Sequence, residues 1–190
     1  AGKWQQSEHF CLLDSPIREL HGQTLGIIGY GELGRAVART GEAFGMRVLV
    51  AERANAAPRE GRTPLETVLA ESHVVSLHCP LTADTRNLIG LDQLIRMRED
   101  AILVNTARGC IVDEAALLHA VQNGQIAGAI VDVLDSEPPR QGNPLLDATL
   151  PNLLVTPHIA WASTASRQQL VNEIAGNIRA WRSGTPRNLV

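Results

Sequence analysis

The fold of this chain is decided by the stretch Thr24-Leu25-Gly26-Ile27-Ile28-Gly29-Tyr30-Gly31-Glu32-Leu33-Gly34. A short apolar run ends in the spacing Gly-x-Gly-x-x-Gly, and an Ala- and Val-rich pattern with helical periodicity follows. A strand, a glycine-rich turn and a helix in this order are the context that a dinucleotide-binding fingerprint requires. Gly29 permits the tight turn, Gly31 lets the backbone approach a pyrophosphate, and Gly34 lets helix and strand pack closely. The stretch therefore predicts a dinucleotide site.

An acidic residue at the end of the next strand supports this interpretation. The pattern from Arg47 to Ala51 predicts a second strand, and Glu52 follows it, 23 positions after Gly29. An acid about 20 residues beyond the first glycine commonly binds the adenosine ribose. The pyrophosphate would lie at the N-terminus of the helix that opens near Glu32, where free N–H groups and the helix dipole favour an anion. An ordinary βαβ turn with a surface glutamate is the alternative.

The composition indicates a domain with a real core. The chain has 190 residues, of which 44% are apolar, and this separates it from disordered sequences. Its net charge of −3 comes from interspersed charges of both signs, so nothing points to nucleic acid or a membrane surface. Three widely spaced cysteines without a CxxC pair favour a reducing compartment and argue against a disulfide or zinc scaffold. We expect a cytoplasmic α/β protein that holds no metal and binds neither nucleic acid nor membrane.

Apolar runs alternate with helical patterns along the rest of the chain. Further strands are predicted at Val74–Leu77, Ala101–Val104, Ile126–Val131 and Leu153–Val155. Helices are predicted at Glu32–Phe44, from Thr63-Pro64 to Leu69 with Thr63 as cap, at Leu91–Met97, from the cap Asp113 to Val121, and at Ser163–Trp181. Residues 53–63 have the composition of an exposed loop. Continuous apolar strands that alternate with helices predict a parallel, doubly wound sheet of the Rossmann type.

Polar residues follow the ends of the predicted strands. In a parallel sheet these ends meet at one edge, and ligands of doubly wound folds bind there. Every strand must end in a loop, so chance alone would bring a few polar residues to this edge. Chance would less often bring an arginine, histidines and acids together. The residues concerned are Glu52, His78, Asn105, Arg108, Asp132 and His158.

Five stretches carry a resemblance to a known family. They are GYGELG at 29–34, LHCPLT at 77–82, NTARG at 105–109, VDVLDSEP at 131–138 and TPHIAW at 156–161. In their order and spacing, along residues 22 to about 185, they resemble the D-isomer-specific 2-hydroxyacid dehydrogenases. The last stretch is most similar to bacterial glycerate dehydrogenases, also called hydroxypyruvate reductases.

The resemblance implies a catalytic trio of Arg108, Glu137 and His158. Reduction of a 2-oxo acid adds a hydride to the carbonyl carbon and a proton to the oxygen. His158 would donate that proton, and accept it in the reverse direction, because imidazole titrates near neutral pH. Glu137 would orient the ring and favour its charged form, and Arg108 would hold the substrate carboxylate and polarise the carbonyl. Without the resemblance, each residue could as well be a surface side chain beyond a strand.

The resemblance also implies how a nicotinamide dinucleotide is held. The phosphates would face the first helix, the turn after the third strand would line the adenosine and ribose, and Asp132 would lie near the nicotinamide carboxamide. Glu52 favours NAD because a carboxylate repels a 2′-phosphate, whereas Arg53 could accept that phosphate, which leaves NADP as the less favoured cofactor. The expected contacts are Gly29, Tyr30, Gly31, Glu32, Leu33, Gly34, Glu52, Arg53, His78, Cys79, Pro80, Thr85, Thr106, Ala107, Arg108, Asp132, His158, Ala160 and Trp161.

The resemblance divides the chain into three parts. Residues 1–21 would form an interdomain connection or dimer arm, and residues 22–160 the dinucleotide-binding domain. Residues 161–190 would form a helix and tail that pack on a leading substrate domain, which we expect to be absent from these 190 residues. We expect a homodimer whose substrate is a small 2-oxo or 2-hydroxy acid, such as hydroxypyruvate or glyoxylate.

Other functions stay open at this point. A catalytically silent dinucleotide-binding module, similar to the corepressor relatives of this family, would keep the fold without turnover. Formate and phosphite dehydrogenases of the family share the trio. A short-chain dehydrogenase is excluded, since it needs a Tyr and a Lys four residues apart, and the only tyrosine is Tyr30 in the glycine turn.

Overall fold

A computed structural model describes residues 2–13, 17–53, 57 and 59–189. Parts of two predicted segments, the N-terminal segment 1–21 and the loop 53–63, therefore lie outside the described residues. In the part that is described, none of the helices is long and apolar enough to cross a membrane.

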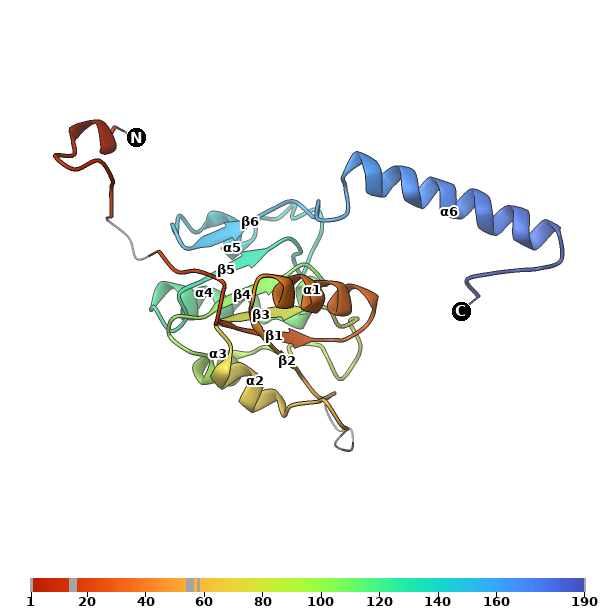
Figure 1. Ribbon diagram of the computed structural model, residues 1–190, viewed down its shortest axis with the longest axis horizontal. Helices are drawn as coiled ribbons and strands as arrows, with labels where there is room; N and C mark the ends of the chain where they lie inside the picture. Colours follow the sequence, from red (N-terminus) through yellow and green to blue (C-terminus); the bar gives the residue numbers. More distant parts are fainter. Residues whose placement is uncertain (1, 14–16, 54–56, 58, 190) are drawn as a thin grey trace.

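The chain folds around one sheet of six parallel strands (Figure 1). The strands are β1 Thr24–Ile28, β2 Arg47–Val50, β3 Val74–Leu77, β4 Ile102–Asn105, β5 Gly128–Val131 and β6 Leu153–Val155. Their spatial order is β2-β1-β3-β4-β5-β6. The chain thus leaves β1 for one side of the sheet and later returns to the other side, so a topological switch point lies between β1 and β3. The predicted parallel, doubly wound sheet is confirmed, with strand ends within two residues of the prediction.

The helices follow the sequence pattern with one correction and one addition. They are α1 Glu32–Ala43, α2 Leu65–Glu71, α3 Leu91–Arg96, α4 Glu114–Gln122, α5 Pro144–Asp147 and α6 Thr164–Arg182, with 3₁₀ turns at Trp4–Gln6 and Gly109–Ile111. Asp113 caps α4 by accepting a hydrogen bond from the Ala116 N–H at 3.0 Å, as predicted. The short helix α5 was not predicted, and the side chain of Asn143 caps it.

The predicted cap Thr63 is wrong. Helix α2 begins after Pro64 without a side-chain cap. Thr63 instead continues the sheet beyond β2, because its N–H donates to Val50 O at 2.9 Å and its carbonyl accepts from the Glu52 N–H at 2.8 Å. The backbone hydrogen bonds available beside the edge strand decide its conformation, and a local capping pattern does not reveal them.

Two hydrophobic clusters cover the two faces of the sheet. On one face α1 packs on Leu25 and Ile27, with Ala38 and Met46 completing the smaller cluster. The larger cluster lies on the other face, where α2, α3 and α4 pack. Gly26 belongs to this second face, since a Cβ on it would press into Val68 of α2. The alternation along β1 therefore buries both faces, as the continuous apolar strand predicts.

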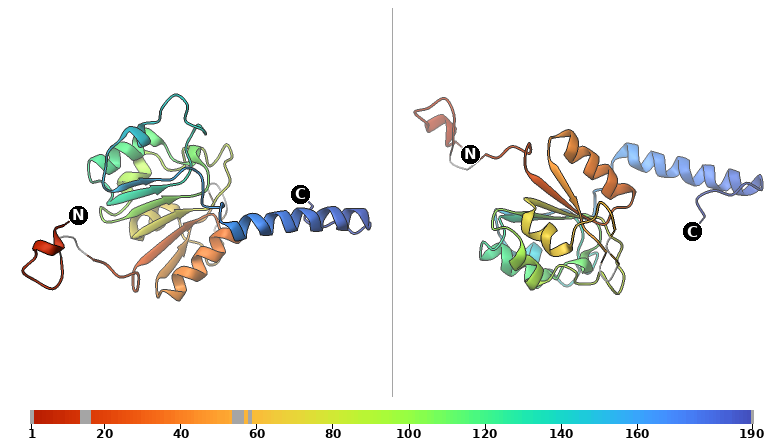
Figure 2. Two further views of the ribbon diagram at one scale, coloured as in Figure 1. Left: turned by 90° about the horizontal axis from the view of Figure 1, so that it is seen from above. Right: turned by 60° about the horizontal axis from the view of Figure 1, so that its bottom comes forward.

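The face covered by α1 stays open over β4, β5 and β6. The parallel register puts Ile102, Ile130 and Leu154 on the same face as Leu25 and Ile27. These three side chains are 37%, 37% and 55% exposed. No described helix covers them, because α6 extends away from the body of the domain and the N-terminal segment extends in the opposite direction (Figures 1 and 2).

Helix α6 carries an apolar face without a partner among the described residues. The predicted spacing is present, and the side chains of Leu170, Ile174, Ile178 and Trp181 are between 50% and 73% exposed. No residue of α6 is buried. The end of the chain folds back on it, since Arg187 pairs with Glu173 at 2.8 Å.

We expect Gly34→Ala to destabilise the domain by about 1–3 kcal/mol, the usual cost of overpacking. A Cβ on Gly34 would overlap the carbonyl oxygen of Gly29, so α1 must move away from β1. Gly31→Ala is the matched control, because a Cβ there meets no atom within 4 Å and its φ of −77° suits alanine. Urea denaturation followed by circular dichroism measures both. Equal stability of the two variants would contradict the packing argument.

Candidate active site

A cavity of about 550 Å³ opens at the switch point of the sheet. It lies beyond the carboxyl ends of β1, β2 and β3, where ligands bind in doubly wound folds. Among the expected cofactor contacts, the structure brings the following to its wall: Gly29, Tyr30, Gly31, Glu52, Arg53, His78, Cys79, Pro80 and Thr85. The first three belong to the glycine turn, the next two follow β2, and the remainder follow β3.

The glycine turn has the shape that a pyrophosphate requires. Gly29 has a φ of +96°, and a Cβ on it would overlap the backbone of His78 and Cys79. Above Gly31 the space is open, so a ligand can approach the backbone there. Gly31 is also the N-cap of α1 and provides no side-chain cap, which leaves the first N–H groups of a 12-residue helix for an anion. These features fit a dinucleotide, whose phosphates would be held by the turn and by Glu32 and Leu33 at the start of α1.

Burial sets the protonation of two side chains on this wall. His78 Nε2 is hydrogen-bonded to Ser76 Oγ at 2.9 Å. Burial lowers the pKa of His78, which favours the neutral ring at pH 7. Burial raises the pKa of the Cys79 thiol. Cys79 is therefore a small apolar wall residue and is not an activated nucleophile.

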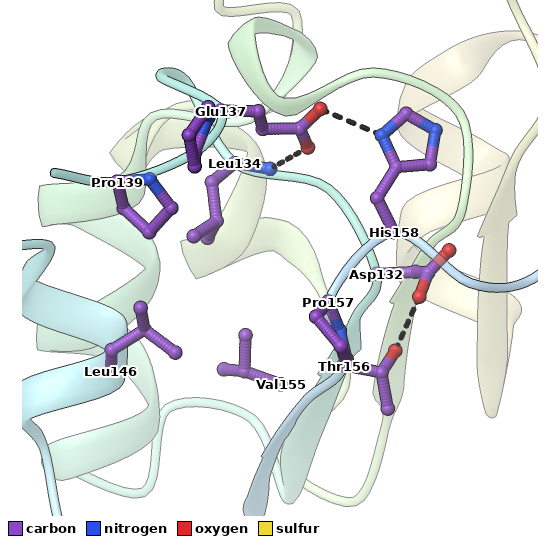
Figure 3. A pocket seen from close by; sticks show the side chains of 10 residues that line it. Asp132, Leu134, Glu137, Pro139, Leu146, Val155, Thr156, Pro157 and His158 are labelled. Atoms are coloured by element: carbon purple, nitrogen blue, oxygen red, sulfur yellow. Dashed lines mark hydrogen bonds and ion pairs between the residues drawn. The ribbon is translucent and has the colours of Figure 1, made fainter.

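A second cavity, of about 210 Å³, lies at the ends of β5 and β6 and contains the predicted acid–base pair (Figure 3). His158 Nδ1 and Glu137 Oε2 are 2.6 Å apart. The other carboxylate oxygen of Glu137 accepts the Leu134 N–H at 2.8 Å, which fixes the orientation of the carboxylate. Because the pair uses Nδ1, the opposite nitrogen, Nε2, is directed away from Glu137.

The loop that carries His158 is held by Asp132, the residue directly after β5. Asp132 is 3% exposed, and its carboxylate accepts hydrogen bonds from Thr156 Oγ1 at 2.5 Å, the Ile159 N–H at 2.9 Å and the Ala160 N–H at 2.8 Å. Burial alone would raise the pKa of Asp132, but these bonds hold it below its ordinary value. His158 itself has a φ of +53°, a conformation unfavourable for a residue with a Cβ.

The contacts of Asp132 bear on its predicted role. The sequence interpretation assigns it to the nicotinamide carboxamide, whereas both of its oxygens accept hydrogen bonds from the loop 156–160. Trp161 secures the same loop, since its indole N–H donates to His158 O at 3.0 Å. Asp132 thus fixes the loop that carries His158, and its contact with the nicotinamide carboxamide stays a prediction.

Arg108 lies in the turn after β4, and its guanidinium is hydrogen-bonded to that turn and not, among the described residues, to the acid–base pair. The Asn105 side chain shapes its turn by donating to Arg108 O at 3.0 Å and accepting from the Ala107 N–H at 3.1 Å. The Arg108 guanidinium donates to Ala107 O at 2.7 Å. Neither cavity has Arg108, Thr106 or Ala107 in its wall. The structure therefore joins two members of the predicted trio and leaves the third on the neighbouring strand end.

The sequence analysis missed a group of arginines at the adenosine end. Glu52 lies where predicted, but its carboxylate pairs with Arg59, and this hydrogen bond lowers its pKa to about 2. Arg62 lies over the Tyr30 ring, with 4.5 Å between the guanidinium carbon and the ring centroid. Arg35 also contacts this ring, at 5.7 Å. The only available signal was the number of arginines in residues 53–63, which does not say which of them meets Glu52.

Comparison with known proteins decides the family. Residues 1–160 match the family profile described as "D-isomer specific 2-hydroxyacid dehydrogenase, NAD binding domain". The chain belongs to this family. NAD is accordingly the cofactor of the domain, and the glycine turn and the cavity above it fit that cofactor.

The similar proteins include several dehydrogenases and reductases. The chain is 51% identical to the glycerate dehydrogenase of Methylorubrum extorquens, over 100% of this chain and 59% of that protein. It is 43% identical to the glyoxylate reductase of Korarchaeum cryptofilum, over 100% of this chain and 58% of that protein. The chain therefore spans less than two thirds of the length of these relatives.

Solved structures agree with the fold. A D-isomer specific 2-hydroxyacid dehydrogenase from Lactobacillus delbrueckii ssp. bulgaricus, in an NAD-complexed form, superimposes with a TM-score of 0.82 at 33% identity, covering 99% of this chain and 62% of that one. An acyclic imino acid reductase in complex with NADPH and D-Arg gives a TM-score of 0.85 at 29% identity, and the match covers 100% of this chain and 60% of that one.

We expect Asp132→Asn to destabilise the domain by about 1–3 kcal/mol, because an amide N–H would face loop donors and leave one of them without an acceptor. The folded-state pKa of Asp132 is depressed, so its contribution is complete above the pKa of the unfolded chain and is lost as the pH falls through the lower folded value. Urea denaturation at pH 7 and at pH 3 measures the difference. Thr156→Val, which removes one donor and keeps the carboxylate, should cost less.

Proposed function

We propose that this chain is the NAD-binding part of an oxidoreductase that interconverts D-2-hydroxy acids and 2-oxo acids. The observation that carries the proposal is the 2.6 Å contact between His158 Nδ1 and Glu137 at the edge of the sheet that also holds the dinucleotide cavity. A histidine oriented by a carboxylate, with its second nitrogen directed elsewhere, is the arrangement of a general acid–base. The names of the similar proteins agree with this class of reaction.

In this proposal the chain's own groups manage the proton and the substrate. The nicotinamide, when bound, supplies or accepts the hydride at the carbonyl carbon. His158 gives a proton from Nε2 to the carbonyl oxygen during reduction and takes it back during oxidation. Glu137 stabilises the imidazolium and fixes the ring, and Asp132 fixes the loop beneath it. Arg108 binds the substrate carboxylate through its fork of N–H donors, which requires its guanidinium to leave Ala107 O.

Hydroxypyruvate and glyoxylate are the proposed substrates. Both are small 2-oxo acids, and the wall beside His158 includes the apolar side chains of Leu134, Pro139 and Leu146 in a cavity of only about 210 Å³. Relatives at 35% to 51% identity are named as enzymes acting on glycerate, hydroxypyruvate or glyoxylate.

The exposed apolar faces support the proposed division of the chain. Residues 22–160 form the dinucleotide-binding domain, and the apolar face of α6 in residues 161–190 would pack on a substrate domain. The N-terminal segment, in which Phe10 is 92% and Leu13 73% exposed, would serve as an interdomain connection or dimer arm. We propose a homodimer in which such arms cover apolar surface of the other chain.

A dinucleotide-binding module without turnover is the second candidate. The observation in its favour is that the guanidinium of Arg108 is bonded to its neighbour's carbonyl and lies outside both cavities. A chain that binds cofactor without assembling the trio on a substrate would act through binding alone.

The first prediction concerns turnover. In the oxidoreductase of which this chain is the NAD-binding part, we expect NADH to be oxidised with hydroxypyruvate and with glyoxylate, and we expect His158→Gln to lower kcat about 10²–10⁴-fold, the usual contribution of a general acid–base. NADH binding, measured by nicotinamide fluorescence, should change far less than kcat. His119→Gln, on the exposed side of α4, is the matched control. Unaltered turnover in H158Q would refute the assignment, and binding of NADH without any turnover would support the second candidate.

The second prediction concerns assembly. We expect sedimentation equilibrium to give a mass near twice that of one chain, because a homodimer would cover apolar side chains that one chain leaves exposed. Leu13→Glu should shift the mass toward the monomer. A wild-type chain that sediments as a monomer at high micromolar concentration would rule out this dimer.

A further inference from the structure

The carboxylate of Glu52 is occupied by protein donors. Its Oε1 accepts from Arg59 Nε at 3.0 Å, from Arg59 Nη2 at 2.5 Å and from the Arg53 N–H at 2.8 Å. Its Oε2 accepts from the Arg59 N–H at 3.0 Å. Two guanidinium donors that converge on one carboxylate oxygen, together with the backbone donors, fix the guanidinium as well as the carboxylate. Glu52 therefore differs from a carboxylate whose oxygens are unoccupied and can accept hydrogen bonds from the hydroxyls of a ribose.

The exposure of the pair shows which partner meets a ligand. The side chain of Glu52 is 13% exposed, whereas that of Arg59 is 45% exposed. The low pKa of Glu52, about 2, means that the carboxylate is ionised at neutral pH and balances the charge of Arg59. Both side chains line the cavity, and the guanidinium of Arg59 is the more exposed of the two.

The surrounding wall is basic. Four arginines line the cavity, Arg35, Arg53, Arg59 and Arg62, against two acids, Glu52 and Asp84. The Tyr30 ring lies within 6 Å of the guanidinium carbons of Arg35 and Arg62, which keeps both cations beside the glycine turn. A phosphate monoester carries close to two negative charges at pH 7 and is best bound by guanidinium groups.

We propose that Arg59 is a specificity-determining residue, which lets the adenosine end of this site accept a ribose 2′-phosphate, so that the chain binds NADPH as well as NADH. The inference rests on the dinucleotide site of the proposed function and extends it to a second nucleotide. An acid at the end of β2 would by itself repel a 2′-phosphate. Its pairing with Arg59 removes that repulsion and puts donors at the same position. A similar solved structure is in complex with NADPH.

The test compares two nucleotides with three variants. Nicotinamide fluorescence gives the Kd of NADH and of NADPH for the wild type, Arg59→Ala, Glu52→Gln and the double variant. We expect wild-type Kd values within about tenfold of each other. Arg59→Ala exposes an unpaired carboxylate, so NADPH should bind at least about tenfold more weakly, while NADH binds equally or more tightly because Glu52 can now accept from ribose hydroxyls. In the double variant most of the NADPH affinity should return, since the repelling charge is gone.

Arg167→Ala is the control, because it removes one positive charge from α6 and lies outside the cavity. Opposite changes for the two nucleotides cannot arise from misfolding, and circular dichroism verifies the fold of each variant. Equal weakening of NADH and NADPH in R59A would overturn the proposal, as would a wild-type chain that binds NADH but binds NADPH more than 100-fold more weakly. A folded chain that binds neither nucleotide would contradict the dinucleotide site itself, and this outcome is distinct from a loss of selectivity.

Discussion

The close approach of three backbone segments at the glycine turn is the constraint on which the cofactor site depends. A Cβ on Gly29 would overlap the backbone of His78 and Cys79, and a Cβ on Gly34 would overlap the Gly29 carbonyl. The turn after β1 therefore lies against the turn after β3 on one side and against α1 on the other. This contact brings the N-terminus of α1 to the switch point of the sheet, where its N–H groups can meet an anion. Larger residues would separate these elements and enlarge the cavity at its phosphate end.

The strands, the glycine turn and most helices could be predicted from the sequence because each is specified by residues that are close together in the chain. Strand periodicity, the glycine spacing and the Asp113 cap each depend on residues within a few positions of one another, and the structure confirms the elements they indicate. The failures concern partners far apart in the chain. Thr63 joins the edge of the sheet through Val50 and so does not cap α2.

The candidate site shows the same division. The trio came from a resemblance, and nothing in the spacing of Glu137 and His158 could establish their 2.6 Å contact. Arg59 was missed because it lies seven positions after Glu52, and no periodicity in the sequence relates the two positions. Side-chain pairs that close over a loop depend on its three-dimensional course, and a single sequence does not encode that course in any simple pattern.

Three carboxylates along the edge of the sheet share one physical role. Glu52 accepts from Arg59, Asp132 accepts from the loop 156–160, and Glu137 accepts from the Leu134 N–H and contacts His158. The Glu52 side chain is 13% exposed against 45% for Arg59, and Asp132 is 3% exposed, whereas Glu137 and His158 are similarly exposed, at 34% and 40%. A carboxylate that is fully hydrogen-bonded within the protein offers little attraction to a further donor, because its lone pairs are already engaged. In our proposals the ligand meets the groups that these acids orient, a guanidinium at the adenosine end and an imidazole at the nicotinamide end. Exchanging one of these acids should change the position or charge of its partner before it changes any direct contact with a ligand.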